Sequence, residues 1–332
     1  MRLTLLLGGT SSERNVSLAS GLRMAAALRE AGHEVRLLDP ATGPIDGPTE
    51  ASMRERAVGS AWPSDAELTA LRAGDQSSSL PMHPLVRDAD CIVLALHGGH
   101  GEDGTVQALL DLSGVPYTGS GAMATAIAMD KDMTKRILSH CGVPTAPWRM
   151  VPVSAEVAIG ALGLPLIVKP NREGSTVGLT IVKERGQFEP AVAEALRYDR
   201  EVMCEAFVPG RELTVPVLAG EALPVGEIIP VKEIYDYECK YTPGMAQEVF
   251  PADLSPEVTQ QVQRYAVRAY SALKLSGCAR IDFRLTVEGT LACLEANTLP
   301  GMTALSLVPQ SALAAGMTFV ELCDRLVVDA VR

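Results

Sequence analysis

The sequence predicts a protein of mixed α/β class (α/β with α+β parts) that is built from more than one domain. An apolar stretch at 3–7 runs into a glycine turn, a helical pattern and a second apolar stretch at 35–38, which is the order of a parallel βαβ unit. Near the other end, two strand patterns within 281–296 predict an antiparallel hairpin. The 332 residues are enough for two or three domains of roughly 100–200 residues each.

Composition and charge narrow the class of protein. Hydrophobic residues make up 47% of the chain and charged residues 21%, as in ordinary globular proteins. The net charge of −11 argues against nucleic acid or an anionic membrane as the main partner. The seven cysteines are scattered without any Cys-x-x-Cys pattern, which predicts reduced thiols in a cytoplasmic protein. We expect no signal peptide and no membrane helix, because no apolar run reaches about 18 residues.

The N-terminal part contains the βαβ pattern and one irregular stretch. Residues 40–83 are rich in Pro, Gly and Ser, with a short helical piece near 65–72, and we interpret them as a variable excursion without a readable function. The expected regular elements are a strand at 3–7, a helix from Val16 to Leu28, strands at 35–38 and 91–96, and a helix at 105–112.

The segment 117–121 marks the first expected domain boundary, and the remaining elements follow it. They are a helix at 122–140, strands at 166–169 and 179–182 around a Gly/Ser loop at 171–178, a strand at 202–207, a polar loop at 236–250, an amphipathic helix at 255–274, the hairpin at 281–296 and a helix near 315–330.

The hairpin carries the most informative group of polar residues. Alternation along a strand places Arg280 and Asp282 on one face, and Glu295 and Asn297 on one face of the neighbouring strand. Two carboxylates and an amide oxygen suit Mg²⁺, which shares its shell with nucleotide phosphates. The guanidinium is placed to neutralise charge at a reacting carbonyl or phosphoryl group. The alternative is a solvated ion pair on an exposed hairpin, which the apolar flanking residues disfavour.

Two further groups point to a nucleotide. Lys131, Lys169 and the loop 171–178 predict a phosphate site, although the chain has no P-loop pattern and such a loop is often a plain connector. Residues 205–208, with Glu212 close behind, predict an apolar slot for a base and a carboxylate for ribose hydroxyls. An ordinary strand edge with a surface glutamate is the alternative interpretation of this second group.

The first glycine turn and its neighbourhood predict a small-molecule site. Glu13 follows the turn at the carboxyl end of a parallel strand, where ligands bind in α/β sheets, and can hold an ammonium group. Its alternative role is to complement the dipole of the following helix. His97 and His100 suggest zinc, but their spacing is short and no third ligand is evident.

Taken together and in this order, these motifs resemble those of the D-alanine–D-alanine ligase family of the ATP-grasp superfamily. The likeness covers nearly the whole chain apart from residues 40–83. The matching motifs are Gly8–Gly9–Thr10–Ser11–x–Glu13, His97–Gly98–x–x–Gly101–Glu102–Asp103–Gly104, the segment 172–178, the segment 235–241, Arg280–Ile281–Asp282, and Glu295–Ala296–Asn297–Thr298–x–Pro300–Gly301.

The resemblance implies a three-domain ATP-grasp fold with an N-terminal parallel-sheet (Rossmann-like) domain. Residues 1–119 would form the N-terminal domain with the first D-alanine site. Residues 120–203 would form the central subdomain with a phosphate-covering loop. Residues 204–332 would form the C-terminal subdomain, with the metal site and a lid loop at 236–250. A homodimer is also implied.

The implied reaction is the ATP-dependent joining of two D-alanine molecules through a D-alanyl phosphate, for peptidoglycan synthesis. Another ATP-grasp ligase that joins D-alanine to D-serine or D-lactate is the alternative. Family members that make the D-lactate ester carry histidine in the loop that here contains Tyr241, so the neutral tyrosine favours an amine nucleophile and a dipeptide. A non-catalytic nucleotide-binding regulator would lack a metal ligand or Arg280, and this chain retains them.

The resemblance also implies roles for individual residues. Those implied to bind ATP are Lys131, Lys169, Ser175, Glu205, Phe207, Val208, Glu212 and Lys240. Those implied to bind two Mg²⁺ ions, with Mn²⁺ as a substitute, are Asp282, Glu295 and Asn297. Those implied to bind the two D-alanine molecules are Glu13, His97, Lys240, Ser306 and Leu307. Those implied to act in catalysis or closure are Glu13, Ser175, Tyr241, Arg280, the Gly301 N–H and Ser306.

One residue departs from the family pattern. Two apolar residues follow Arg-x-Asp in the family, whereas Phe283 is followed here by Arg284. Alternation places Arg284 on the same face as Asp282, towards the expected nucleotide. We expect a nucleotide contact, with a turn out to solvent as the alternative.

Overall fold

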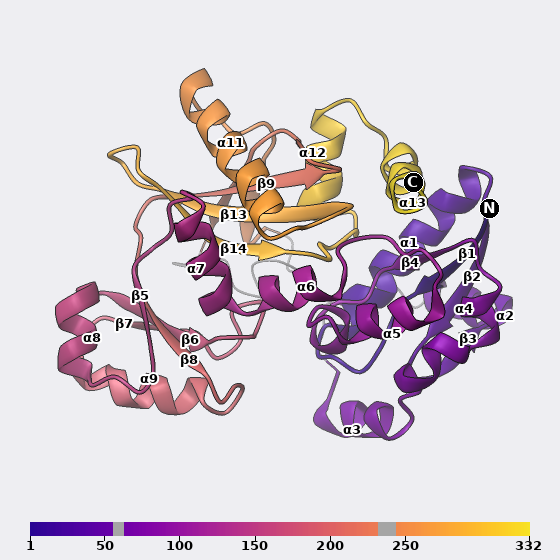
Figure 1. Ribbon diagram of the computed structural model, residues 1–332, viewed down its shortest axis with the longest axis horizontal. Coiled ribbons are helices and arrows are strands. Elements are labelled where there is room, and N and C mark those ends of the chain that lie inside the picture. The colour runs from indigo at the N-terminus through magenta and orange to yellow at the C-terminus, as the bar shows by residue number, and fades with distance from the viewer. Residues whose placement is uncertain (56–62, 232–243) are drawn as a thin grey trace.

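The structure is a computed structural model that describes residues 1–55, 63–231 and 244–332. Its strands form three sheets, as expected for a mixed α/β chain (Figure 1). The sheet of the N-terminal part and its helices lie on one side of the molecule. A small sheet formed by β5 to β8 and a larger sheet formed mainly by β9, β13 and β14 lie on the other side. No helix in these described ranges has the length and apolar character needed to span a bilayer.

The N-terminal sheet has the order β3-β2-β1-β4 and confirms the parallel βαβ prediction. The strands β1 (Arg2–Leu6), β2 (Glu34–Asp39) and β4 (Cys91–Leu94) are parallel, and α1 (Arg14–Glu30) connects the first two. Leu3, Leu5 and Leu7 pack on the α1 side, whereas Leu6 packs in a second core on the opposite face. Burial on both faces explains the nearly continuous apolar run of the first strand.

The last helix of the chain completes the core of this first sheet. Helix α13 (Phe319–Ala330) buries Leu322, Leu326 and Val327 in the same apolar cluster as Leu3 and Leu5. It begins with a capping box between Thr318 and Glu321 rather than near 315. The two ends of the sequence therefore share one core.

The stretch 40–83, which the sequence suggested to be a variable excursion, contributes to the N-terminal sheet and to its second core. Strand β3 (Gly43–Ile45) adds an antiparallel edge to the sheet, and Leu80 is 2% exposed in the second core. The other elements of this stretch are α2 (Gly47–Glu55), α3 (Asp65–Ala73) and the 3-10 helix η1 (Ser77–Met82). The apolar residues of this stretch that pack in the core are isolated in the sequence and form no periodic pattern. Sequence analysis therefore did not predict their burial.

A four-stranded antiparallel sheet forms the central part, in the order β5-β8-β6-β7. Its strands are β5 (Trp148–Met150), β6 (Leu166–Pro170), β7 (Thr180–Val182) and β8 (Val202–Ala206). Helices α8 (Ala155–Leu162) and α9 (Phe188–Ala195) cover it through a core of their own. The predicted boundary between 203 and 204 falls inside β8 and is therefore wrong, because β8 pairs with β5 and β6. The chain crosses to the next sheet at 207–210.

The larger sheet has the order β12-β11-β9-β13-β14, with the short β10 (Glu221–Ala222) beside β9. Its other strands are β9 (Arg211–Leu218), β11 (Gly226–Pro230), β12 (Ala246–Val249), β13 (Cys278–Leu285) and β14 (Leu291–Asn297). Helices α6 (Ala122–Met129), α7 (Lys131–His140) and α11 (Pro256–Ala272) pack on it. Because α6 and α7 share this core, residues 122–140 belong with the larger sheet, whereas the prediction had placed them in the central part.

The single helix predicted at 122–140 is two helices. Asp130 leaves the helical conformation at φ −80° and ψ 99°, and its carboxylate accepts a hydrogen bond from the Met133 N–H at 3.0 Å. Such an N-cap starts a new helix, and it makes Lys131 the first residue of α7. The remaining short elements are α4 (Pro84–Arg87), η2 (Gly99–Gly101), α5 (Thr105–Ser113), η3 (Arg185–Gln187) and α12 (Leu307–Ala314).

The polar loop predicted at 236–250 is wrong for its last part. Residues 246–249 form β12, which pairs with β11. The stretch Ala246–Gln247–Glu248–Val249 has no apolar run, so its pairing depends on the neighbouring strand rather than on local preference. The earlier part of that loop, including Lys240 and Tyr241, lies outside the described residues. The proposed division into three domains otherwise remains a prediction.

We expect the crossing at 207–210 to require glycine at position 210. Gly210 has φ +125°, and a Cβ there would lie 2.1 Å from the Leu285 carbonyl oxygen. Gly210→Ala should therefore lower the free energy of unfolding by roughly 2–4 kcal/mol. Gly160→Ala on α8 is the control, because a Cβ there meets open space, and it should change stability by less than about 1 kcal/mol. Equal denaturant midpoints for the two variants would contradict this prediction.

Candidate functional site

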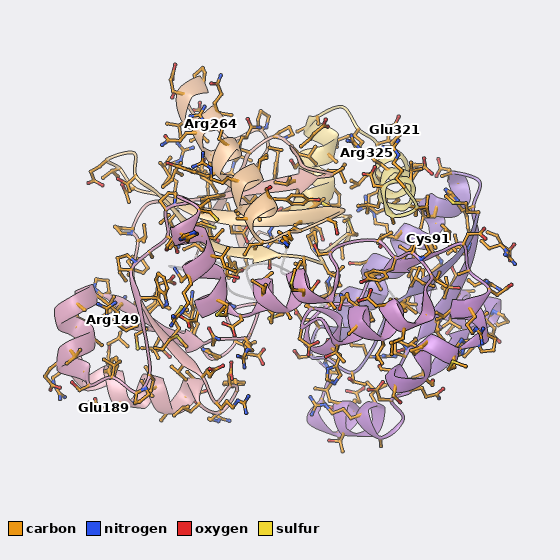
Figure 2. The ribbon with its side chains drawn as sticks, in the orientation of Figure 1. Cys91, Arg149, Glu189, Arg264, Glu321 and Arg325 are labelled. Carbon is orange, nitrogen blue, oxygen red and sulfur yellow. The ribbon has the colours of Figure 1, made fainter. Side chains whose placement is uncertain are left out.

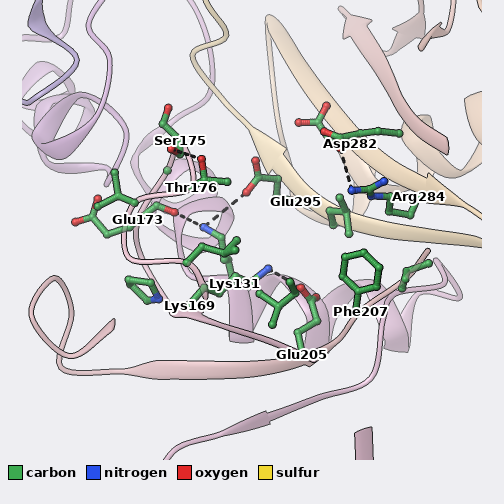
Figure 3. A pocket seen from close by; sticks show the side chains of 18 of the residues that line it. Lys131, Lys169, Glu173, Ser175, Thr176, Glu205, Phe207, Asp282, Arg284 and Glu295 are labelled. Carbon is green, nitrogen blue, oxygen red and sulfur yellow. Dashed lines mark hydrogen bonds and ion pairs between the residues drawn. The ribbon is translucent and has the colours of Figure 1, made fainter. Parts of the chain in front are cut away.

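A deep cleft lies between the central sheet and the larger sheet. The space between its walls is about 980 Å³ when the mouth that opens to solvent is included. Side chains from both sheets and from the loop 171–178 face it (Figure 3). It brings together most residues predicted for the nucleotide and the metal: Lys131, Lys169, Ser175, Glu205, Phe207, Val208, Glu212, Arg280, Asp282, Arg284 and Glu295.

Oxygen atoms of neighbouring residues in the cleft hold the ammonium groups of its two lysines. The Lys131 ammonium donates to the Glu173 carbonyl at 2.5 Å and lies 3.7 Å from a Glu295 carboxylate oxygen. The Lys169 ammonium donates to Glu205 at 2.6 Å. Burial lowers the pKa of Lys131, and the Glu295 carboxylate opposes that shift. Both cations thus lie at the cleft, where they can face phosphate oxygens.

The hairpin confirms the predicted convergence of polar side chains. Arg280 pairs with Asn297, and Asp282 pairs with Glu295, with a bulge directly after Asp282. The Asp282 carboxylate accepts from the Arg280 guanidinium at 2.9–3.2 Å and from the Asn297 amide at 3.0 Å. It also accepts a 2.7 Å hydrogen bond from the buried Thr214 hydroxyl on β9. Thr214 was not predicted, and its position in a missed strand explains why.

The donor set at this hairpin fits Mg²⁺. Asp282 and Glu295 are directly opposite on neighbouring strands, and Asn297 contacts the same Asp282 carboxylate. Carboxylate and amide oxygens are ligands that Mg²⁺ accepts when phosphate oxygens complete its shell. Among the described residues, no three His, Cys, Asp or Glu side chains cluster as a metal site by themselves, and the third side chain of this group is the Asn297 amide.

A second part of the cleft has apolar walls and is bordered by an ion pair. Phe207 and Val208 line it together with Ile167 and Ile228. The Arg284 guanidinium lies 3.3 Å from a Glu212 carboxylate oxygen and donates to the Gly210 carbonyl at 2.9 Å. Arg284 therefore faces the cleft, as alternation predicted, rather than turning out to solvent.

The loop 171–178 connects the cleft to the N-terminal sheet. Ser175 and Thr176 adopt positive φ angles of 50° and 61°, a conformation that is unfavourable for residues other than glycine. The Ser175 hydroxyl donates a 2.6 Å hydrogen bond to the Glu13 carboxylate. Two of the residues implied to act in catalysis or closure are thus in contact, whereas a third, Tyr241, lies outside the described residues.

Glu13 and His97 lie in a second group of polar side chains at the ends of β1 and β4. The His97 ring lies 3.2 Å from the Ser20 hydroxyl and 3.6 Å from a Glu102 carboxylate oxygen. Burial raises the pKa of Glu102, and the nearby His97 side chain opposes that shift. His100 is exposed and contacts Asp103 instead, so the two histidines that suggested zinc have different partners.

A buried ion pair supports the glycine turn, and the sequence analysis missed it. Asp39 is fully buried at the end of β2 and pairs with Arg14. Its carboxylate also accepts the Gly9 N–H at 3.0 Å, and a Cβ on Gly8 would lie 2.6 Å from it. The one signal in the sequence is the aspartate at the end of the apolar strand that follows the first glycine turn and its helix.

The segment 301–307 lies where the N-terminal sheet meets the larger sheet. The Ser306 hydroxyl accepts a hydrogen bond from the Thr303 N–H at 2.9 Å, and Ser306 precedes the first residue of α12, the buried Leu307. Gly301 lies close to the same hydroxyl, because a Cβ there would be 2.8 Å away. The Met302 N–H donates to Ser20 at 3.1 Å, so one serine contacts both His97 and this segment.

Comparison with known proteins decides the family. Models of the "D-ala D-ala ligase N-terminus" and "D-ala D-ala ligase C-terminus" match residues 2–120 and 137–328. The chain belongs to the D-alanine–D-alanine ligase family. This confirms the resemblance and the ATP-grasp fold that it implied.

Individual members of the family match over their full length. A D-alanine–D-alanine ligase of Aquifex aeolicus (strain VF5) is 41% identical over 328 residues, which is 98% of this chain and 100% of the relative. One of Gloeobacter violaceus is 40% identical over 333 residues, 98% of each chain. The crystal structure of the Bacillus anthracis ligase complexed with ATP superposes with a TM-score of 0.79 at 31% identity, covering 100% of this chain and 97% of that one.

We expect Ser175→Ala to loosen the loop 171–178. The variant removes the hydrogen bond to Glu13, a charge-assisted contact worth roughly 1.5–3 kcal/mol. Amide hydrogen exchange in residues 172–178 should accelerate at least about tenfold, since each 1.4 kcal/mol is a factor of ten. Ser79→Ala, which removes a surface hydroxyl on η1, is the control. Unchanged protection of the loop in Ser175→Ala would show that Glu13 does not hold it.

Proposed function

We propose that this protein joins two D-alanine molecules into D-alanyl-D-alanine, using ATP bound in the cleft. The observation that carries the proposal is the cleft itself. It places two buried lysines opposite a hairpin with Asp282 and Glu295, in a chain that matches D-alanine–D-alanine ligases over their full length. ATP as the nucleotide is supported by the ATP-bound structure of the Bacillus anthracis relative.

The reaction needs an activated carboxylate. A carboxylate is a poor acyl donor, so transfer of the terminal phosphoryl group of ATP to the first D-alanine gives a D-alanyl phosphate. The amine of the second D-alanine then attacks the carbonyl carbon, and phosphate leaves. Negative charge develops on oxygen in both steps, and the Arg280 guanidinium at the hairpin is suited to stabilise it together with the Gly301 N–H.

We propose that Asp282, Glu295 and Asn297 hold two Mg²⁺ ions, which Mn²⁺ can replace. Bound there, the ions would neutralise charge on the phosphate oxygens of ATP. Lys131 and Lys169 face the same cleft and would bind the phosphates. Phe207 and Val208 would enclose the base, while Glu205 and Glu212 would contact base and ribose.

We propose that the amino-acid sites lie next to this cleft. Glu13 would take the ammonium group of the first D-alanine, and its hydrogen bond to Ser175 would couple that site to the loop over the phosphates. His97, Ser306 and Leu307, with Lys240, would position the substrates. An acyl phosphate hydrolyses readily, so the loop 171–178 and the segment 236–250 would serve to exclude water.

We also propose that the protein acts in the cytoplasm, as a homodimer, in peptidoglycan synthesis. The cytoplasmic location is supported by the cysteines: the six that lie in the described residues are all free thiols. The homodimer rests on the family resemblance alone.

Phosphate release from the purified protein tests the function. We expect release with Mg-ATP and D-alanine, with a product whose mass is that of the dipeptide. Parallel reactions with L-alanine, or with D-serine or D-lactate as the second substrate, test stereochemistry and the alternative ligase activities. Asp282→Asn should abolish release, because it removes a ligand charge. Release only with another acid and amine would leave the ATP-grasp chemistry and overturn the D-alanine assignment.

Arg284→Met should raise the KM for ATP by about 3–10-fold with little change in kcat. The guanidinium fixes the Glu212 carboxylate and the Gly210 carbonyl, and losing a hydrogen bond of this kind costs roughly 1 kcal/mol. Arg264→Met is the control, because Arg264 is exposed on the outer helix α11 (Figure 2). An ATP KM that equals that of the control would show that Arg284 does not shape the nucleotide site.

A further inference from the structure

A buried lysine that the proposed mechanism does not use lies behind the cleft. Lys135, on α7, is 1% exposed and does not line the cleft. Its ammonium group donates to the Thr145 hydroxyl at 2.5 Å and to the Ala146 carbonyl at 3.1 Å, and it forms an ion pair with Glu205. The Trp148 ring centroid lies 5.4 Å away. Every donor direction of this ammonium group is therefore used inside the protein.

Glu205 is shared between two lysines that differ in position. Its Oε1 atom faces Lys135, and its Oε2 atom accepts from Lys169 at 2.6 Å. Glu205 and Lys169 line the cleft, as Figure 3 shows. Lys135 is buried and is not among the residues that line it. The Glu205 carboxylate therefore has two partners. Lys135 is the inner partner, and Lys169 is the outer partner that a ligand in the cleft can reach.

This arrangement keeps Glu205 paired when a nucleotide binds in the cleft. Phosphate oxygens that enter the cleft compete with Glu205 for the Lys169 ammonium group. If Lys169 were the carboxylate's sole partner, its departure would leave a buried, unpaired charge, which is strongly destabilising. Because Lys135 stays in place, Glu205 can remain ionised while Lys169 turns to the phosphates.

The Glu205 carboxylate lies next to the part of the cleft that is proposed to enclose the base. Glu205 directly precedes Ala206, Phe207 and Val208, which line the apolar slot. An ionised carboxylate accepts hydrogen bonds and cannot donate them, so at this position it favours a base with an exocyclic amine over one with a carbonyl oxygen. A site built to pair with an N–H group discriminates strongly against analogues that lack it.

We propose that Lys135 is a positioning residue that holds Glu205 as a charged acceptor and thereby makes the cleft selective for a 6-amino purine. The proposal rests on the proposed function only in taking the ligand to be a nucleoside triphosphate. Burial raises the pKa of Glu205, but the two lysines outweigh that effect and hold it below its ordinary value, which agrees with the geometry.

Lys135→Met tests the proposal with ATP and inosine triphosphate, which carries a carbonyl oxygen in place of the 6-amino group. We expect the KM for ATP to rise at least about tenfold while kcat changes less than about threefold. The preference for ATP over inosine triphosphate, measured as the ratio of kcat/KM values, should fall at least about tenfold. Arg136→Met, an exposed cation on the same helix, is the control and should leave both quantities unchanged.

The result that would overturn the proposal is an unchanged preference between the two nucleotides. A purely structural lysine would alter stability and leave that preference intact. If Lys135→Met does not fold, the double variant Lys135→Met with Glu205→Gln should fold, because it removes both charges of the inner pair while Lys169 still faces the open cleft, and it should show the same preference as Glu205→Gln alone. A double variant that also fails to fold, or a Glu205→Gln variant with full preference for ATP, would equally overturn it.

Calorimetric titration of wild type and Lys135→Met with each nucleotide separates this proposal from the proposed function. If the wild type prefers ATP to inosine triphosphate and Lys135→Met loses that preference, the role of Lys135 stands whether or not D-alanine is the substrate. If the wild type binds ATP but releases no phosphate with D-alanine, the proposed function alone is overturned.

Discussion

Buried charge is the constraint on which the nucleotide cleft depends. The cleft contains ammonium and carboxylate groups that are buried away from bulk water. To bind a ligand, these groups must stay charged while the cleft is empty. The structure achieves this by pairing them with one another: Lys169 with Glu205, Lys131 with Glu295, and Arg280 with Asp282. A ligand with phosphates and metal ions would exchange these pairs for its own contacts, which costs less than desolvating isolated charges. The site is therefore largely preorganised without carrying uncompensated charge.

The same pairing depends on the register of the strands. The β13–β14 hairpin sets Asp282 opposite Glu295 and Arg280 opposite Asn297, and β9 adds Thr214 from the other side. A slip of one residue would turn all of these groups to the opposite face. The apolar residues between them, such as the fully buried Ile281 and Phe283, hold that register by packing beneath α11. The core of the larger sheet thus fixes the geometry of its polar face.

Sequence reasoning found the parts of this protein that are periodic or carry a motif. The βαβ unit, the hairpin and its polar face followed from alternation, and the family followed from the order of the motifs. The break at Asp130 was missed because residues 122–140 are helical in preference on both sides of it, and a single N-cap decides the geometry. Strand β12 and Thr214 depend on partners distant in sequence. No role was predicted for Lys135, since a lysine on a helix is normally solvated.

The shared core of the two chain ends has a consequence for biosynthesis. Strand β1 leaves the ribosome well before α13, which packs on the same side of that sheet. The N-terminal sheet therefore cannot complete its core until α13 has been made, although α1 already covers part of it. The central sheet, whose core is made by residues 151–204 alone, has no such requirement. During synthesis the middle of this protein can thus reach its final packing before its beginning does, the reverse of the order in which the segments are made.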